Sequence, residues 1–424
     1  MAFVGVAPIT LGRVAALAAT IGVCVRTAPL AVAVCGTVLR VVVMCARVAV
    51  FAGVFASVAG AVGPMPDLGV LGSGARAEGF AQVLEPQPFE FPRDHGPHPD
   101  YRQEWWYVTG NLDATNGERF GFELTFFRFA LAPASEQLAS SVQPTSSSVE
   151  SRWRTRQIYM AHFAITDVSR KRFRFAQKLS RGAVGLAGAQ TTPLRVWIDD
   201  WSLRSVSPDE AHWSLHAMES GYELTLDAQG LLQPILNGDR GFSRKSSDPG
   251  SASYYYSIPR VAVRGLLVRD GKPLDVRGLA WLDREWGSGT LSSNEQGWDW
   301  FALQLKDGSS LMFYALRDQD GRRDPNSAGT WISATGLSRA LSSDQVQIEA
   351  LEYWTNPRGE RYPSRWHIRV PTTGIDVDVR PVLRNQELTL AARYWEGAVD
   401  VTGATPDQKP EGRGYVELVG YAAQ

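Results

Sequence analysis

The chain has 424 residues, of which 44% are apolar and 10% aromatic, and its formal net charge at pH 7 is -1. This composition supplies enough apolar surface for two or three packed domains and excludes disorder for most of the chain. The near-neutral charge, without a basic patch interleaved with aromatic residues, argues against nucleic acid as a partner.

Residues 1–77 differ in composition from the rest and are predicted to be a leader. Residues 1–63 contain no acid and no lysine, and four arginines interrupt their Ala- and Val-rich runs. The last run follows Met44 and precedes A-R-A at 75–77, a small-x-small cleavage pattern typical of a secretory signal. We therefore expect translation to start at Met44 and the mature protein to be periplasmic or secreted. The alternative is an inner-membrane anchor formed by this region.

The cysteines and charges agree with export. All three cysteines, Cys24, Cys35 and Cys45, lie in the leader, so the mature protein would have no disulfide and no thiol chemistry. Removing residues 1–77 subtracts five arginines and one aspartate from the 43 basic and 44 acidic residues, which leaves 38 and 43. The mature chain is therefore mildly acidic.

From Gln82 onward the sequence predicts strands joined by tight turns. Asn-Gly at 116–117 and Asp-Gly at 270–271 and 307–308 separate runs rich in Val, Phe, Tyr, Trp and Leu, as in β-hairpins. No window after Glu104 keeps the apolar spacing of a helix for three turns. We expect an all-β, mainly antiparallel protein with few short helices.

An aromatic hairpin pattern occurs twice, at Glu104 and again at Trp298. About eight strand candidates follow the second start, a number common in small barrels that hold a ligand. We therefore expect two tandem barrels, one over residues 78–289 and one over residues 290–424, with a boundary near Ser288. The alternative is a single β-sandwich with an elaborate edge.

The stretch W-L-D-R-E-W at 281–286 carries two candidate catalytic carboxyls. Strand alternation places Asp283 and Glu285 on one face and Arg284 on the other. Buried charge costs free energy unless it is paired or protonated, so these acids are either a site or part of a structural network. The structural alternative is a buried ion-pair network with Arg284 and Glu104 that joins the two domains.

Asp299 is a third candidate catalytic residue, because alternation sets it among apolar residues on the face opposite Trp298 and Trp300. The large aromatic residues of these stretches are the candidate ligand contacts: Trp105, Trp106, Tyr107, Trp281, Trp286, Trp298, Trp300 and Trp395. For several of these tryptophans the alternative is a place in the core or at a closed barrel end. Histidines without regular spacing, and the lack of cysteine after the leader, lead us to expect no metal site and no cofactor.

Four motifs occur in order: D-H-G-P-H-P-D-Y-R-Q-E-W-W-Y-V-T-G-N-L at 94–112, W-L-D-R-E-W-G-S at 281–288, G-W-D-W-F-A-L-Q-L at 297–305 and Y-W-E-G-A-V at 394–399. They resemble the AttH family of exported lipocalin-like proteins, whose superfamily includes carotenoid 1,2-hydratase. The resemblance implies two lipocalin-like barrels, an association with ABC-type export systems and an older label of secreted hydrolase.

The same resemblance bears on chemistry. Asp283 matches the aspartate of an H-D-H-N-W-G-like stretch of the hydratases, but Leu282 and Arg284 stand where that stretch has histidines. A hydratase protonates carbon with a strong acid and holds the cation away from bulk water. A guanidinium near Asp283 would lower its pKa and spoil it as that acid.

Three functions remain open. The first is an exported carrier whose barrel holds a lipid or isoprenoid, with an ABC transporter permease as a partner. The second is a lyase that adds water to an isoprenoid C=C bond, and the third is a structural module with filled barrels. A secreted hydrolase is a further alternative, although no G-x-S-x-G motif supplies its nucleophile. An apolar cavity without an acid favours the carrier, and a cavity with an acid favours the lyase.

Overall fold

The computed structural model describes residues 79–133, 155–207, 211–219, 221–289, 294–390, 393–403 and 411–421. The predicted leader lies outside these ranges. The described elements are antiparallel strands and two short 3-10 helices, η2 (Arg93–His95) and η3 (Ser343–Gln345). The prediction of an all-β protein with few short helices is confirmed. Within these ranges no helix is long and apolar enough to cross a bilayer.

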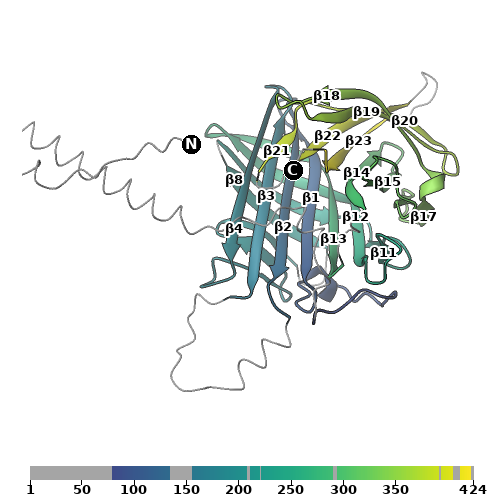
Figure 1. Cartoon of the computed structure of the whole chain (residues 1–424). Coiled ribbons are helices and arrows are strands. Elements are labelled where there is room, and N and C mark those ends of the chain that lie inside the picture. Colours follow the sequence, from purple (N-terminus) through teal and green to yellow (C-terminus); the bar gives the residue numbers. More distant parts are fainter. Residues whose placement is uncertain are drawn as a thin grey trace, which may run out of the picture. The chain divides into compact units, whose positions relative to one another are not determined.

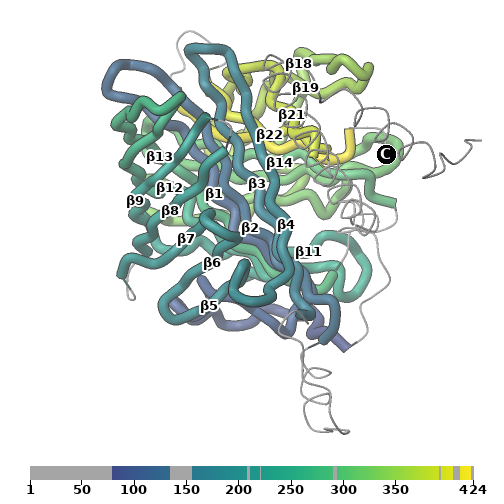
Figure 2. Tube along the Cα trace, turned by 90° about the vertical axis from the view of Figure 1, so that its left-hand side faces the viewer, coloured from purple at the N-terminus to yellow at the C-terminus, as the bar shows by residue number. Residues whose placement is uncertain are grey.

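The first sheet has 13 strands and curves into a nearly closed barrel (Figures 1 and 2). The strand order is β4-β3-β2-β1-β13-β12-β9-β8-β7-β6-β5, and β10 and β11 both pair with β12. Its strands are β1 (Gln103–Ala114), β2 (Arg119–Ala130), β3 (Gln157–Asp167), β4 (Arg172–Arg181), β5 (Ala187–Gln190), β6 (Arg195–Ile198), β7 (Trp201–Ser205), β8 (His212–Glu219), β9 (Tyr222–Gly230), β10 (Ile235–Leu236), β11 (Phe242–Arg244), β12 (Ala252–Arg269) and β13 (Lys272–Gly287).

The second sheet has 10 strands and forms a half-barrel. The strand order is β17-β16-β15-β14-β23-β22-β20-β19-β18, and β21 pairs with β22. Its strands are β14 (Glu295–Leu305), β15 (Ser310–Asp318), β16 (Ala328–Ile332), β17 (Ser338–Ser342), β18 (Gln347–Thr355), β19 (Arg361–Val370), β20 (Ile375–Pro381), β21 (Glu387–Thr389), β22 (Arg393–Gly403) and β23 (Gly412–Val419). Two consecutive barrel-like units were predicted, and the second is less closed than the first.

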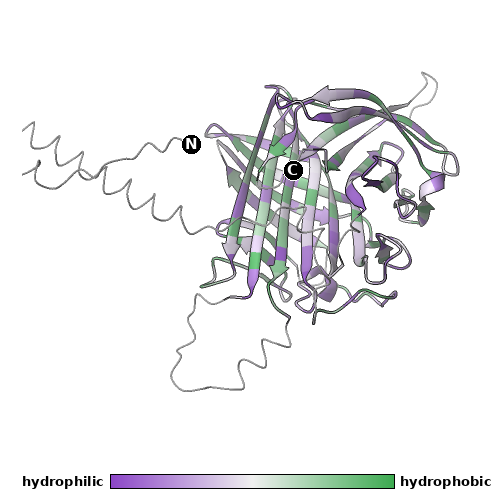
Figure 3. Ribbon diagram, viewed as in Figure 1, coloured by the Kyte–Doolittle hydropathy of each residue, from purple (hydrophilic) through white to green (hydrophobic). Residues whose placement is uncertain are grey.

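Alternation along the strands separates two sets of side chains. In β1, Trp106, Val108 and Leu112 belong to the core of the first barrel, whereas Tyr107 and Asn111 contact the second sheet. Strands covered on both sides are buried along nearly their whole length, as β3 is, while the edge strand β4 is largely hydrophilic (Figure 3).

Bulky side chains fill both concave faces. The first core includes Trp106, Trp201, Trp213 and Trp286, and a separate core under the second sheet includes Trp395. A third apolar cluster lies where the sheets meet and contains Tyr107, Ile235, Tyr255, Trp281, Trp300, Ala302, Met312, Tyr314, Leu316, Ile332, Ala398 and Tyr415.

Polar contacts also join the sheets. Asn111 Nδ2 donates to the Gly414 carbonyl at 3.0 Å, and Thr166 Oγ1 donates to Gln386 Oε1 at 2.7 Å. The second sheet therefore packs on the outer face of the first barrel, and the outward-facing residues of β1, β2, β12 and β13 become interior positions of the molecule.

Candidate functional site

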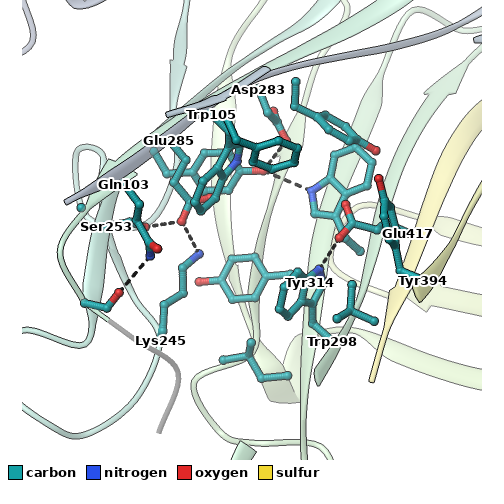
Figure 4. Close-up of a pocket in the computed structure, with 18 of the residues that line it drawn as sticks. Gln103, Trp105, Lys245, Ser253, Asp283, Glu285, Trp298, Tyr314, Tyr394 and Glu417 are labelled. Carbon is teal, nitrogen blue, oxygen red and sulfur yellow. Dashed lines mark hydrogen bonds and ion pairs between the residues drawn. The ribbon is translucent and has the colours of Figure 1, made fainter. Parts of the chain in front are cut away.

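A cavity of about 190 Å³ lies between the two sheets. Its lining is mainly apolar and aromatic and comes from β1, β2, β12 and β13 of the first sheet and β14, β15, β22 and β23 of the second (Figure 4). We expected a ligand cavity inside a barrel, and this expectation is wrong. Side chains fill both concave faces, and the cavity forms where the two outer layers of side chains meet.

Asp283 lies in the wall formed by β13. Its Oδ1 accepts hydrogen bonds from Ser257 Oγ at 2.5 Å and Trp281 Nε1 at 2.6 Å, and its Oδ2 accepts one from Tyr255 Oη at 2.5 Å. Trp300 Nε1, from the second sheet, donates to the same Tyr255 hydroxyl at 3.2 Å. Neutral groups of the first sheet thus hold this buried carboxyl in place, and the second sheet in turn holds Tyr255.

Burial raises the pKa of Asp283 to about 7, although its three hydrogen bonds oppose the rise. The next residue, Arg284, points to the opposite face of β13. Among the described residues no basic side chain forms an ion pair with Asp283, whose partners are neutral. The interpretation that placed Asp283 in an ion-pair network with Arg284 is therefore wrong.

Glu285 lines the same wall but has a cation beside it. Lys245 Nζ lies 3.0 Å from Glu285 Oε1, and Ser253 Oγ donates to that oxygen. The ammonium group also lies over the rings of Tyr314 at 4.2 Å and Tyr255 at 5.2 Å. Burial lowers the pKa of Lys245, but the interactions with Glu285, Tyr314 and Asp283 together outweigh this effect, and the pKa is raised overall. The pair is thus a carboxylate and an ammonium, next to a carboxyl that holds its proton.

Three further carboxyls line the cavity: Glu123 on β2, Glu396 on β22 and Glu417 on β23. Tyr107 Oη donates to Glu396 Oε1, and Trp298 Nε1 donates to Glu417 Oε1 at 2.9 Å. Burial raises the pKa of Glu123 to about 7 and that of Glu417 to about 8. Burial, together with the charges of the other two, raises the pKa of Glu396 well above its ordinary value.

Arg284 and Glu104 lie together on the other side of β13, inside the first barrel. Arg284 Nη2 pairs with Glu104 Oε2, and Arg128 Nε pairs with Glu104 Oε1, with all three side chains at most 2% exposed. The Arg284 guanidinium also lies 3.8 Å from the centre of the Trp106 ring. Because this cluster points away from the cavity, its role is structural.

Asp299 does not line the cavity. It lies on the opposite face of β14, where Arg317 Nε is 2.9 Å from its Oδ1 and Tyr421 Oη donates to the same oxygen at 3.0 Å. The prediction that Asp299 is a catalytic residue is therefore wrong, because its carboxyl group is bound by Arg317 and Tyr421 outside the cavity.

The predicted aromatic ligand contacts divide between cavity and core. Those that line the cavity are Trp105, Tyr107, Trp298 and Trp300, and Trp281 borders it through its hydrogen bond to Asp283. Those packed in the cores instead are Trp106, Trp286 and Trp395. For these three the expectation of ligand contact is wrong, since alternation turns each of them to the concave face of its sheet.

Several lining residues were missed in the sequence. Tyr394 and Glu396 belong to the Y-W-E-G-A-V motif, and alternation puts both on the face opposite Trp395, the residue that was chosen. Glu123 is a lone acid in an apolar strand, which is a usable signal. Lys245 follows β11 in a loop, and no local pattern points to it.

The comparisons with known proteins agree with this architecture. The AttH-like family model matches residues 82–421. The crystal structure of an AttH protein from Nitrosomonas europaea is 34% identical, has a TM-score of 0.70, and its alignment covers 81% of this chain and 100% of that one. Kievitone hydratase from Nectria haematococca shares the fold at 15% identity, with a TM-score of 0.59 and coverage of 81% of this chain and 97% of that one.

A curated relative is the dehydratase asqC of Emericella nidulans, 23% identical over 209 residues. The match covers 47% of this chain and 58% of that protein, so this chain spans little more than half of the relative's length. The family match and the AttH structure each cover most of the described chain. The protein belongs to the AttH-like family.

Proposed function

We propose that the protein adds water to, or removes water from, a small apolar substrate held in the cavity, with Asp283 as the general acid. The observation that carries this proposal is a buried carboxyl in the cavity wall, held by three neutral donors, with a pKa raised to about 7. A group that holds its proton near neutral pH inside an apolar site is suited to protonate a substrate.

The two carboxyls on β13 can divide the work of such a reaction. In the direction of water loss, Asp283 gives its proton to the substrate hydroxyl, the C–O bond breaks and water leaves. The Glu285 carboxylate then takes a proton from the neighbouring carbon, and the C=C bond forms. The two residues are two positions apart on one strand, about 7 Å along it, so both can reach adjacent substrate atoms. Proton exchange with solvent restores both groups. In the reverse direction the roles exchange: protonated Glu285 gives its proton to carbon, and the Asp283 carboxylate takes one from the water that adds.

The aromatic walls support this chemistry. Trp105, Trp298 and Trp300 line the cavity, and aromatic faces stabilise positive charge that develops on carbon. The relatives named as a dehydratase and a hydratase also favour water loss or gain as the reaction class.

A hydrolase finds less support at this site. Lys245 Nζ donates to Ser243 Oγ at 3.2 Å, the arrangement that a Ser–Lys nucleophile would need. Although burial opposes it, the interactions with Glu285, Tyr314 and Asp283 together raise the pKa of Lys245, so the amine keeps its proton and is a poor base.

A carrier without chemistry is the second candidate, favoured by the apolar and aromatic lining. Export to the periplasm and handover to an ABC transporter permease remain predictions from the sequence. If the protein is a carrier, the wild type and the Asp283→Asn variant should bind a lipid or isoprenoid equally well, and neither should convert it.

The test uses the purified protein and a panel of small tertiary alcohols, β-hydroxyketones and short isoprenoid alkenes. Mass spectrometry follows the loss or gain of one water, with oxygen-18 water as the tracer. We expect conversion by the wild type, none by Asp283→Asn, and normal conversion by Asp299→Asn, a matched buried aspartate outside the cavity. Conversion that survives in Asp283→Asn would overturn the assigned acid, and binding without conversion would favour the carrier.

A further inference from the structure

The cavity is lined by three carboxyl groups that the proposed reaction does not use. Glu123 comes from the first sheet, and Glu396 and Glu417 come from the second, where they are direct cross-strand neighbours in the register of β22 and β23. Carboxylates placed directly opposite each other on paired strands repel. We call these three residues the carboxyl cluster.

Two oxygens of the carboxyl cluster have no partner in the described structure. Glu123 Oε2 and Glu396 Oε2 are both buried without a hydrogen bond, and both residues line the cavity and are 0% exposed. Their other oxygens are occupied: Thr125 Oγ1 donates to Glu123 Oε1 at 2.9 Å, and Tyr107 Oη donates to Glu396 Oε1. Because a buried unsatisfied oxygen is costly, its presence beside a cavity points to a missing donor.

Among the described residues that line the cavity, no cation contacts these oxygens. Lys245 is the basic residue of that lining, and its ammonium group is paired with Glu285 on the other side of the space (Figure 4). Without a cation the carboxyl cluster keeps protons, which agrees with the raised pKa of Glu123 and Glu417. A positively charged group placed there would release protons and provide the missing donors at once.

We propose that the carboxyl cluster binds the ammonium group of an organic amine, whose apolar remainder lies against the aromatic walls of the cavity. Tyr107, Tyr394 and Trp298 border the cluster, and the faces of aromatic rings attract a cationic head group. An organic cation is favoured over a metal ion. Within the described ranges no set of three His, Cys, Asp or Glu side chains, the carboxyl cluster included, is arranged so that it could hold a metal ion. The inference rests on the proposed function for the location of the ligand, although not for the chemistry at Asp283.

The experiment uses phenethylamine as the probe, with 2-phenylethanol as its neutral counterpart and phenylacetate as its anionic one. Isothermal titration calorimetry at pH 8 should show the amine binding about tenfold or more tightly than the alcohol, the gain expected from charged hydrogen bonds, and phenylacetate should not bind. Titrations in buffers of different ionisation enthalpy should show proton release, because the cation displaces protons from the carboxyls.

The pH dependence has a defined sign. Amine affinity should rise from pH 6 to pH 8.5 as the carboxyls lose their protons, while the amine itself stays charged. The other titratable groups that face the cluster are Tyr107, His162, Tyr394, Tyr415, Asp283 and Glu285. Burial lowers the pKa of His162 to about 4 and raises that of the tyrosines well above 10, so these do not titrate in this window. Asp283, with a pKa of about 7, does titrate in it, so the pH series is repeated with Asp283→Asn, in which the rise in amine affinity should persist.

Variants separate this inference from the proposed reaction. The double variant Glu123→Gln with Glu396→Gln should lose the preference for the amine, and glutamine imitates the protonated carboxyls, so the fold should persist in a thermal melt. Asp283→Asn should keep the amine preference even if it abolishes water loss or gain. Equal affinity of the wild type for amine and alcohol, absence of binding by both, or an unchanged preference in the double variant would each overturn the amine subsite.

Discussion

At the scale of single residues, burial and partners set the charge of a carboxyl in this protein, and sequence neighbours do not. Asp283 and Arg284 are adjacent in the chain, yet alternation sends one into the cavity and the other into the first barrel. Asp283 keeps its proton to about pH 7 among neutral donors, while Glu285 pairs with Lys245 in the same wall.

The first prediction concerns stability and pH at Asp283. Between about pH 3.8 and about pH 7 the folded protein holds a proton there that the unfolded chain releases, so the wild type loses stability as pH rises through that window. Asparagine keeps the oxygen that accepts from Ser257 and Trp281, and its amide can donate to Tyr255. Asp283→Asn should melt like the wild type near pH 4 and be more stable at pH 8 by up to roughly 4 kcal/mol.

The matched control for this prediction is Glu285→Gln, two residues away in the same wall. It removes the partner of the Lys245 ammonium, so it should destabilise the protein at pH 8 by about 1–3 kcal/mol. Urea denaturation at both pH values measures the two variants. A loss of stability in Asp283→Asn at pH 8 would contradict the assignment of a protonated Asp283.

At the scale of elements, the pairing of β1 with β13 determines which side chains meet inside the first barrel. The register sets Glu104 opposite Trp286 and Trp106 opposite Arg284, which brings Glu104 and Arg284 to the same interior face. Although burial opposes it, the charges of Arg128 and Arg284 hold the pKa of Glu104 well below its usual range. The Glu104 carboxylate is therefore the counter-charge of two buried guanidinium groups.

The second prediction follows from this arrangement. Glu104→Gln leaves Arg128 and Arg284 buried without a counter-charge, which should cost about 3–5 kcal/mol in the free energy of unfolding. The control is Lys306→Met, which breaks the exposed pair with Glu411 and should change stability by less than about 1 kcal/mol. Chemical denaturation compares the two, and similar small losses in both would show that the buried network is dispensable.

At the scale of the whole molecule, the second sheet turns the outer face of the first barrel into an interior. The approach is close: a Cβ added to Gly121 on β2 would lie 2.5 Å from the Cβ of Ala398 on β22. The hydrogen bond of Asn111 with Gly414 fixes the same approach on the neighbouring strands, because Asn111 on β1 is the cross-strand partner of Gly121.

The third prediction tests that approach. Gly121→Ala should destabilise the protein by about 1–3 kcal/mol, because the added methyl group overpacks the contact between the sheets. Adding Ala398→Gly should recover most of the loss, since it restores the space. A double-mutant cycle from thermal melts measures the coupling. Strictly additive losses would mean that the two sheets do not meet at these residues.

Much of the fold and part of the site could be predicted from the sequence. Period-two alternation and turn dipeptides determined the all-β class, and the repeated aromatic hairpin pointed to two barrel-like units. The same alternation correctly set Asp283 and Glu285 on one face and Arg284 on the other. These features depend on local geometry, which the order of residues determines directly.

Only the tertiary structure decided which face of each strand became a cavity. Trp395 and Glu396 are adjacent in the chain, and alternation places their side chains on opposite faces of β22. Because both faces of this strand are buried, alternation does not tell which face packs in the core and which lines the cavity. Nor does it bring Lys245 to Glu285 or Glu123 to Glu396, residues that lie far apart in the chain. The protonation of Asp283 follows from burial, which outweighs the opposing effect of its hydrogen bonds, so it exists only once the sheets have packed.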